Sequence, residues 1–279
     1  MNIGAIVQAR FASTRFPGKI LKELPYASGV TVLQQVIRRL RRSKSLNEII
    51  IATTTGNNEN AIVEIAEKEN VGSFRGSEND VLSRYYLAAK ERGLDIVVRV
   101  TSDCPCIDPE IIDSMIKEHL SVEADYTSNS LDRTCPHGLD AEVFNFRALE
   151  KAQENAQKDY EREHVTPYIS RKPSLFKIKA FKTPQGIYAP DVRITLDTKE
   201  DYALLLAVFD YLYPKNNYFT AHEIVTLFQE KPWLKLINKK IIQKKVFDTL
   251  EDELEEVNKI LDLQELRRAR DFIKGHLTK

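Results

Sequence analysis

The sequence has few cysteines, little glycine and no long hydrophobic run. There are three cysteines and ten glycines in 279 residues. Cys104 and Cys106 stand too close together for an ordinary disulfide framework, so we expect reduced thiols and a cytoplasmic protein. No run approaches the roughly 20 apolar residues that cross a bilayer. Met1 leads directly into an apolar segment without a basic leader, so we expect no signal peptide and no membrane partner.

The sequence also has no excess of positive or of negative residues. Lysine and arginine together number 41, as do aspartate and glutamate. A protein with balanced charge is not expected to coat a nucleic acid, although a local anion site is compatible with it. Hydrophobic residues make up 42% of the chain, enough to bury a substantial core.

Short apolar runs alternate with helical patterns through the first half of the chain. This rhythm predicts an α/β fold with a mixed, mostly parallel sheet flanked by helices. The second half predicts short strands and turns over residues 124–147 and a helix over 160–170. The expected strands of the first half are 3–7, 49–53 and 96–100, its helices 31–42, 58–70, 80–92 and 108–119, and the later elements are strands 176–181 and 192–196 and helix 199–211.

The C-terminal part differs in character. Between Ile241 and Gly275 there is neither glycine nor proline, and Leu250, Leu254, Val257 and Leu261 repeat at helical spacing. We therefore predict a main domain over residues 1–233 and a helical extension over 234–279. The apolar face of the extension could pack on its own domain, or it could contact a partner or a second copy of the chain.

The most informative segment follows the first predicted strand. Loops beyond the carboxyl ends of parallel strands are where open α/β sheets bind ligands. Arginine forks and a compact lysine ammonium suit phosphate oxygens, and backbone N–H groups and hydroxyls complete such a cradle. The segment matches neither the P-loop nor the G-x-G-x-x-G pattern. It predicts a triphosphate site made by Gln8, Ala9, Arg10, Ser13, Thr14, Arg15 and Lys19.

Two aspartates follow later predicted strands. Asp103 comes after 96–100, and Asp197 comes after 192–196. Carboxylates that converge on a triphosphate hold Mg²⁺, which prefers hard oxygen ligands and keeps phosphates and waters in its shell. An aspartate after a strand can instead be a helix cap, and that is what we expect of Asp108, which precedes Pro109.

The loop resembles the signature of the cytidylyltransferases that make CMP-activated sugar acids. Members include the 3-deoxy-manno-octulosonate and acylneuraminate enzymes, and the likeness is strongest to the spore coat polysaccharide biosynthesis protein F group. It extends from Ile3 to about Asn238. The resemblance implies a Rossmann-like nucleotide-diphospho-sugar transferase fold and a homodimer. It implies Mg²⁺-dependent transfer of CMP from CTP to a sugar acid or similar acidic small molecule, with pyrophosphate released, for surface polysaccharide precursors.

The resemblance also implies roles for single residues. Arg75 corresponds to the cytosine-side loop of the family, whereas Thr101 stands where some relatives carry a glutamine that touches the base. Asp103 and Asp197 correspond to the metal-binding aspartates. The catalytic residues would be Arg10, Lys19 and Asp103, with Arg75, Thr101 and Asp103 joining the loop in the nucleotide site. The residues assigned to the acceptor pocket are His137, Asp140, Glu142, Glu163, His164 and Arg193, although in the family the regions of the first five line either that pocket or a dimer contact.

Three other functions fit the sequence less well. Cys104, Cys106, Cys135 and His137 could form a zinc set on paper, but the one-residue gap of Cys104-Pro105-Cys106 does not fit zinc knuckles. A glycosyltransferase that uses a nucleotide sugar often carries D-x-D, which Asp103-Cys104-Pro105 lacks. A non-catalytic nucleotide-binding scaffold would not need the loop and both aspartates. Pyrophosphate release separates the transferase from these alternatives.

Overall fold

The computed structural model describes residues 1–13, 15–241 and 249–277. The chain divides into two compact units, Met1–Ile241 and Ile242–Lys279. The first unit is an α/β domain and the second is helical, as the sequence predicts.

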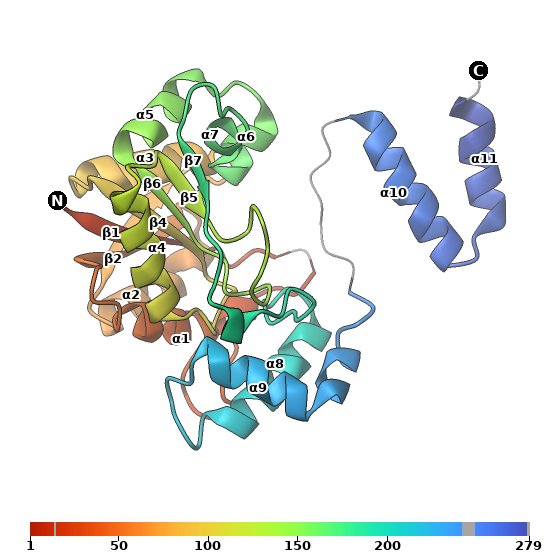
Figure 1. The fold of residues 1–279 in the computed structure, drawn as a ribbon, viewed down its shortest axis with the longest axis horizontal. Coiled ribbons are helices and arrows are strands. Elements are labelled where there is room, and N and C mark those ends of the chain that lie inside the picture. The colour runs from red at the N-terminus through yellow and green to blue at the C-terminus, as the bar shows by residue number, and fades with distance from the viewer. Residues whose placement is uncertain (14, 242–248, 278–279) are drawn as a thin grey trace. The chain divides into compact units, whose positions relative to one another are not determined.

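A seven-stranded sheet forms the centre of the first unit in the described chain (Figure 1). Its order is β3-β2-β1-β4-β6-β5-β7. The first four strands are parallel, β6 runs antiparallel to β4 and β5, and β7 lies parallel to β5. The mixed, mostly parallel sheet is thus confirmed. The bounds are β1 Ile3–Gln8, β2 Glu48–Thr54, β3 Gly72–Gly76, β4 Ile96–Thr101, β5 Tyr126–Ser128, β6 Glu142–Asn145 and β7 Ile178–Ala180.

The strand order places a topological switch between β1 and β4. From β1 the chain proceeds outward through β2 and β3, then returns to the other side of β1 as β4. The loops after β1 and β4 therefore start at the carboxyl edge of the sheet, at the position where open α/β sheets bind ligands. These two loops carry Lys19 and Asp103.

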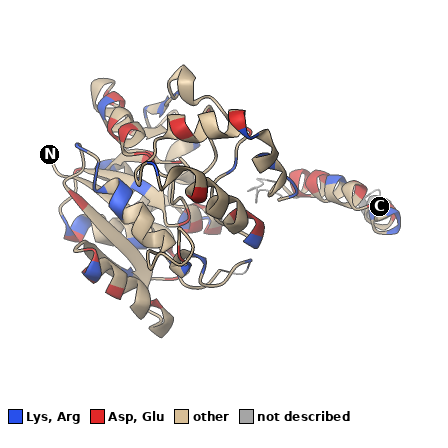
Figure 2. Ribbon diagram, turned by 90° about the horizontal axis from the view of Figure 1, so that it is seen from below, with Lys and Arg blue, Asp and Glu red and all other residues tan. Residues whose placement is uncertain are grey.

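Helices cover both faces of the sheet and bury two apolar clusters. One face is covered by α1 (Val32–Leu40), α2 (Asn60–Lys68), α4 (Pro109–Ser121), α8 (Lys199–Leu212) and α9 (Ala221–Glu230). The other is covered by α3 (Val81–Glu91), α5 (Phe146–Asn155) and α7 (Pro167–Ser170), with α6 (Asp159–His164) packed against α3 and α7. Figure 2 shows positive and negative residues interspersed on these helices, in line with the balanced charge.

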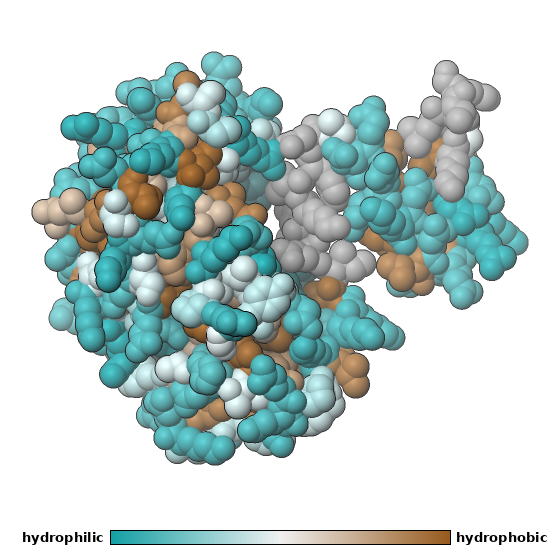
Figure 3. Space-filling model, viewed as in Figure 1, coloured by the Kyte–Doolittle hydropathy of each residue, from teal (hydrophilic) through white to brown (hydrophobic). Residues whose placement is uncertain are grey.

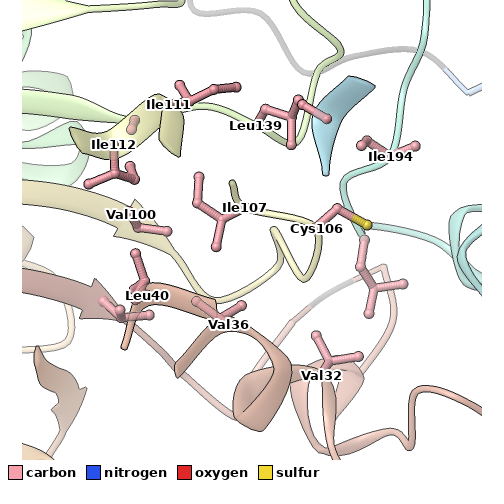
Figure 4. Close-up of a cluster of buried hydrophobic side chains, with 14 of the residues drawn as sticks. Val32, Val36, Leu40, Val100, Cys106, Ile107, Ile111, Ile112, Leu139 and Ile194 are labelled. Carbon is pink, nitrogen blue, oxygen red and sulfur yellow. The ribbon is translucent and has the colours of Figure 1, made fainter. Parts of the chain in front are cut away.

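The loop after β4 is anchored by apolar packing. In Figure 4, Cys106 and Ile107 of this loop lie among side chains of α1, β4 and α4. Both are fully buried. Burial of this segment fixes the backbone that leads from Asp103 into α4, where Asp108 caps the helix by accepting from the Glu110 N–H at 2.9 Å.

Two predictions of secondary structure were wrong. Residues 192–196 do not form a strand of the sheet; they make an isolated bridge between Arg193 and His137. Their backbone groups bond to loops instead: the Ile194 N–H donates to the carbonyl of His137 and the Leu196 N–H to that of Asp103. The predicted helix 160–170 is interrupted at Val165, whose φ of +72° lies outside the helical region, so α6 and α7 are separate.

The boundary between the units also lies later than predicted. Leu234, in the short helix η4 (Pro232–Leu236), is fully buried. The Asn238 side chain donates to Asp201 and to the carbonyl of Arg193. These contacts attach residues 234–241 to the first unit, so the boundary falls after Ile241 rather than after residue 233.

The second unit consists of α10 (Leu250–Leu263) and α11 (Arg267–Leu277) in its described part. Arg270 of α11 pairs with Asp262 of α10 at 2.6 Å. Several apolar side chains of this unit are exposed, and Figure 3 shows brown, hydrophobic atoms among its hydrophilic ones. No helix in the described ranges combines the length and apolar character needed to cross a membrane.

Candidate nucleotide and metal site

The loop after β1 is closed by its own backbone. The Ala9 N–H donates to the carbonyl of Ala52 on β2, and the Gly18 N–H donates to the carbonyl of Phe11, at 3.1 Å. Gly18 has a φ of +66°, a left-handed conformation that glycine adopts without steric cost. The loop thus folds back on itself and places Lys19 at the start of the short helix η1 (Lys19–Leu21).

A buried glutamate that sequence reasoning missed secures the same loop. Both carboxylate oxygens of Glu59 accept from the Phe11 N–H at 3.1 Å, and Oε2 also accepts from the Thr53 hydroxyl at 2.7 Å. Glu59 belongs to the short helix η2 (Asn57–Glu59) after β2 and is only 5% exposed. The helix pattern around Glu59 gives no hint of this contact, because its partner is 48 residues away.

Lys19 joins the two predicted metal-binding aspartates. Its Nζ lies 2.7 Å from Oδ2 of Asp103 and 2.9 Å from Oδ1 of Asp197, and it also donates to the carbonyl of Leu196 at 2.6 Å. Burial lowers the pKa of Lys19, but the two carboxylates outweigh that effect and the pKa is raised. The ammonium therefore stays charged at any working pH and holds residues from three loops at the switch point.

Asp197 contacts three cationic side chains. Burial raises its pKa, but Lys19, Arg193 and Arg15 outweigh that and bring the pKa to about 2. Arg15 lies 3.0 Å from Oδ1 and Arg193 lies 2.7 Å from Oδ2. The site thus gathers three cations around two aspartates, an arrangement that is ready to exchange protein carboxylates for phosphate oxygens.

Asp201 positions Asp197 and was also missed. It is buried at the first turn of α8, where Oδ2 accepts from the N–H groups of Asp197 and Thr198. Its carboxylate also accepts two bonds from Arg193, at 3.0 and 3.1 Å. The spacing of Thr198 and Asp201 is that of a capping box, which the structure contains and which could have indicated a structural role.

Asp103 and Asp197 provide a donor set that fits Mg²⁺. Among the described residues there is no cluster of three or more potential metal ligands of the His, Cys, Asp and Glu types. Magnesium commonly takes only one or two carboxylates and completes its shell with substrate phosphates and waters. The Lys19 ammonium, a cation already shared by both carboxylates, marks the place that a divalent ion would favour electrostatically.

The predicted acceptor residues fall into separate places. His137 and Asp140 lie beside Arg193, the partner of Asp197: Nδ1 of His137 is 3.1 Å from Nη1 of Arg193, and Nε2 is 3.6 Å from Asp140. Asp140 in turn pairs with Arg133 at 2.6 Å. Burial lowers the pKa of His137, so the neutral imidazole accepts from Arg193.

Glu142 is not in that group. It forms a buried ion pair with Arg99 of β4, and its Oε1 accepts from the hydroxyls of Tyr126 and Thr166. Side chains two positions apart share one face of a strand, which would bring Asp140 and Glu142 together. However, β6 begins only at Glu142, and the two carboxylates have different partners. Glu163 is exposed on α6, and His164 is half-buried at its end.

The two residues predicted to lie near the base, Arg75 and Thr101, are on different strands, β3 and β4. Arg75 is exposed at the end of β3, and its guanidinium donates to the carbonyls of Thr54 and Gly56 and to Asn60, so it braces the loop after β2. Gln8 and Thr101 are paired in register at the ends of β1 and β4. Of the remaining loop residues, Ala9 is buried, Arg10 is exposed, Ser13 is half-buried and Thr14 lies outside the described residues.

The cysteines are free and buried. Burial raises the pKa of Cys106 and of Cys135 to about 12, and burial together with Asp103 raises that of Cys104 well above its ordinary value. Neutral thiols in apolar packing are poor metal ligands. This agrees with their interpretation as buried free thiols.

Gly138 packs closely against the backbone of the segment that leads to Asp197. Its φ is +115°, and a Cβ there would lie 2.7 Å from the backbone of Ile194 and Thr195. We predict that Gly138→Ala lowers the free energy of unfolding by roughly 3 kcal/mol and reduces activity, because the segment before Asp197 must move. Urea unfolding measures the first effect.

Gly29 offers a matched control for that substitution. Its φ is +69°, but no atom lies within 4 Å of the position of an added Cβ. Gly29→Ala should cost only the conformational ~1–2 kcal/mol and leave activity unchanged. Equal losses of stability in the two variants would contradict a steric contact at Gly138.

Comparisons with known proteins show which family the chain resembles. The family model described as Cytidylyltransferase matches residues 4–267. The spore coat polysaccharide biosynthesis protein SpsF of Bacillus subtilis is 33% identical over 232 residues, 81% of this chain and 94% of that protein. A 3-deoxy-manno-octulosonate cytidylyltransferase of Geobacter sulfurreducens is 36% identical over 123 residues, covering 42% and 44%. The solved structure of a cytidylyltransferase from Leptospira borgpetersenii has a TM-score of 0.79 and 35% identity, covering 88% of this chain and 100% of that one.

Proposed function

Because the chain belongs to the cytidylyltransferase family and is a CTP-dependent nucleotidyltransferase, we propose that it transfers CMP from CTP to a sugar acid or similar acidic small molecule. Pyrophosphate is the second product, and Mg²⁺ is the metal. The single observation that carries this proposal is the contact of Lys19 with both Asp103 and Asp197 at the switch point of the sheet.

The cations of the loop have a direct role in this reaction. An acceptor oxygen attacks the α-phosphate and the bond to the β-phosphate breaks, so negative charge accumulates on pyrophosphate. Arg10, Arg15 and Lys19 are suited to hold the β- and γ-phosphates and stabilise that charge. Lys19 and Arg15 now contact carboxylates, and a triphosphate offers them equivalent oxygen acceptors.

Asp103 and Asp197 would hold the metal. Bound Mg²⁺ supplies Lewis-acid stabilisation of the phosphate oxygens. Asp201 and Arg193 keep the Asp197 carboxylate in position, and burial of Cys106 and Ile107 fixes the loop that carries Asp103. Neither aspartate needs to act as a general base in this scheme.

The acceptor pocket is proposed to lie beside the metal, at His137, Asp140 and Arg193. Arg193 and the neighbouring Arg133 now pair with aspartates, and the carboxylate of an acidic acceptor offers their guanidinium groups equivalent oxygen acceptors. The relatives named for 3-deoxy-manno-octulosonate and for spore coat polysaccharide support a sugar acid used in surface polysaccharide precursors. Free buried cysteines favour a reducing cytoplasm, and we propose a homodimer, as the resemblance implies.

A coupled assay tests the reaction class. The protein is incubated with CTP, Mg²⁺ and a panel of acids that includes 3-deoxy-manno-octulosonate, and pyrophosphate is measured. We expect acid-dependent release that disappears with EDTA and returns with excess Mg²⁺. Release of CDP or CMP without pyrophosphate, or no release with any acid, would contradict the proposal. A thermal-shift comparison of CTP, UTP, GTP, ATP and dTTP shows independently which nucleotide binds.

A further inference from the structure

The side-chain amide of Gln8 is held in one orientation. Gln8 is the last residue of β1, and its Oε1 accepts from Nη2 of Arg99 at 3.0 Å. A guanidinium has donors only, so the amide oxygen rather than the amide nitrogen must face Arg99. The two ends of the Gln8 amide are therefore distinguished by chemistry.

Arg99 is itself immobilised. Burial opposes its charge, but Glu142 outweighs that and the pKa of Arg99 is raised. Glu142 is ionised as well: burial raises its pKa, and Arg99 with Tyr126 and Thr166 outweighs burial and lowers it. Reversing the Gln8 amide would set an N–H₂ against a buried cation, which costs about 1–3 kcal/mol for the lost bond.

The nitrogen end of the Gln8 amide lies at the carboxyl end of β1. Among the described residues, Nε2 of Gln8 has no hydrogen-bond acceptor, and it is not one of the buried polar atoms without a partner. Gln8 is half-buried beside Thr101, between the two loops of the switch point. Its main-chain carbonyl already accepts from the Ser102 N–H, so the side-chain Nε2–H₂ remains available to a ligand.

A ligand that binds there must offer an acceptor. Cytosine presents N3 and O2 as adjacent acceptors, whereas N3 of uracil carries a hydrogen. We propose that Gln8 selects cytosine over uracil by donating from Nε2 to N3 of the base, with Arg99 and Glu142 fixing the amide. This inference rests on the proposed function, because it assigns a base contact to the same nucleotide site. The expected base reader, Arg75, already donates to the loop after β2.

Nucleotide analogues test this contact in the unmodified protein. Isothermal titration with Mg²⁺ and no acceptor gives the affinities for CTP, UTP and 3-deaza-CTP, in which N3 is replaced by a C–H group. We expect CTP to bind on the order of 10- to 100-fold more tightly than either of the others. In Gln8→Leu the three affinities should fall within about threefold of one another. Gln185→Leu, a substitution of an exposed glutamine in η3 (Gln185–Ile187), should keep the wild-type ratios.

Two results would overturn the inference. One is equal binding of CTP and 3-deaza-CTP by the wild-type protein; the other is an unchanged ratio in Gln8→Leu, which would make Gln8 a structural residue only. Because these titrations need no acceptor, they are independent of the transfer reaction. If CTP is preferred but no acid accepts CMP, the proposed function fails and the role of Gln8 stands.

Discussion

Asp103→Asn should lower kcat/KM by roughly 10³-fold, about 4 kcal/mol of transition-state stabilisation, while the protein stays folded. Asparagine keeps the shape of the side chain and can still accept from Lys19, but it lacks the charge that a divalent ion requires. The backbone of this loop is unaffected, because the Asp103 carbonyl continues to accept from the Leu196 N–H and the Thr195 hydroxyl. Steady-state pyrophosphate release with saturating Mg²⁺ measures the loss.

Asp108 provides the control within the same loop. It caps α4 and accepts from the Ala221 N–H at 2.7 Å, so its role is structural. Asp108→Asn should lower the free energy of unfolding by about 1–2 kcal/mol and leave kcat/KM within a few-fold of wild type. If both variants lost activity equally, or if Asp103→Asn stayed within tenfold of wild type, Asp103 would not hold the metal.

Lys19→Met should reduce kcat by roughly 10²- to 10³-fold, because a cation that stabilises the leaving pyrophosphate is removed. It should also strengthen binding of Mn²⁺ to the nucleotide-free protein. The ammonium now lies 2.7 Å from Asp103 and 2.9 Å from Asp197, so its removal takes away the one cation among the described residues that contacts both carboxylates and that a divalent ion would have to displace. Rapid-quench kinetics measures the first effect, and electron paramagnetic resonance of free Mn²⁺ measures the second.

Lys22 is the matched lysine for this experiment. It is exposed, three residues along the chain, and its Nζ lies over the ring of Phe16. Lys22→Met should alter neither kcat nor Mn²⁺ binding. Wild-type activity in Lys19→Met would show that Lys19 does not stabilise the leaving pyrophosphate. Unchanged Mn²⁺ binding would show that the two carboxylates do not share a cation site.

Much of the fold could be predicted from the sequence because the signals are local. Apolar runs and helical periodicity identify β1, β2, β4 and α1 to α4, and the Gly18 turn lies inside one short segment. The segment 192–196 was misjudged as a strand because its apolar pattern is that of a buried extended chain. Whether such a segment pairs with a strand or with loops depends on which partner lies beside it, and the pattern does not contain that information.

The sequence indicates candidate residues for the site but not the contacts between them. Lys19 and Asp197 are 178 positions apart, and only the strand order brings them together. Glu142 was expected to face an acceptor, but Arg99 of β4 pairs with it. Arg99 stands 43 positions earlier in the chain, where the sequence pattern is that of an exposed strand residue. Glu59 and Asp201 were not predicted because each accepts hydrogen bonds from backbone N–H groups. The residue type alone does not distinguish such a carboxylate from one that is exposed to solvent.

Transfer of CMP itself can be followed with CTP labelled separately at the α- and γ-phosphates. With Mg²⁺ and a sugar acid, we expect the α-label in the acid adduct and the γ-label in pyrophosphate, in a one-to-one ratio. Recovery of both labels in one product, or an acid that never acquires the α-label while CTP is consumed, would contradict this expectation.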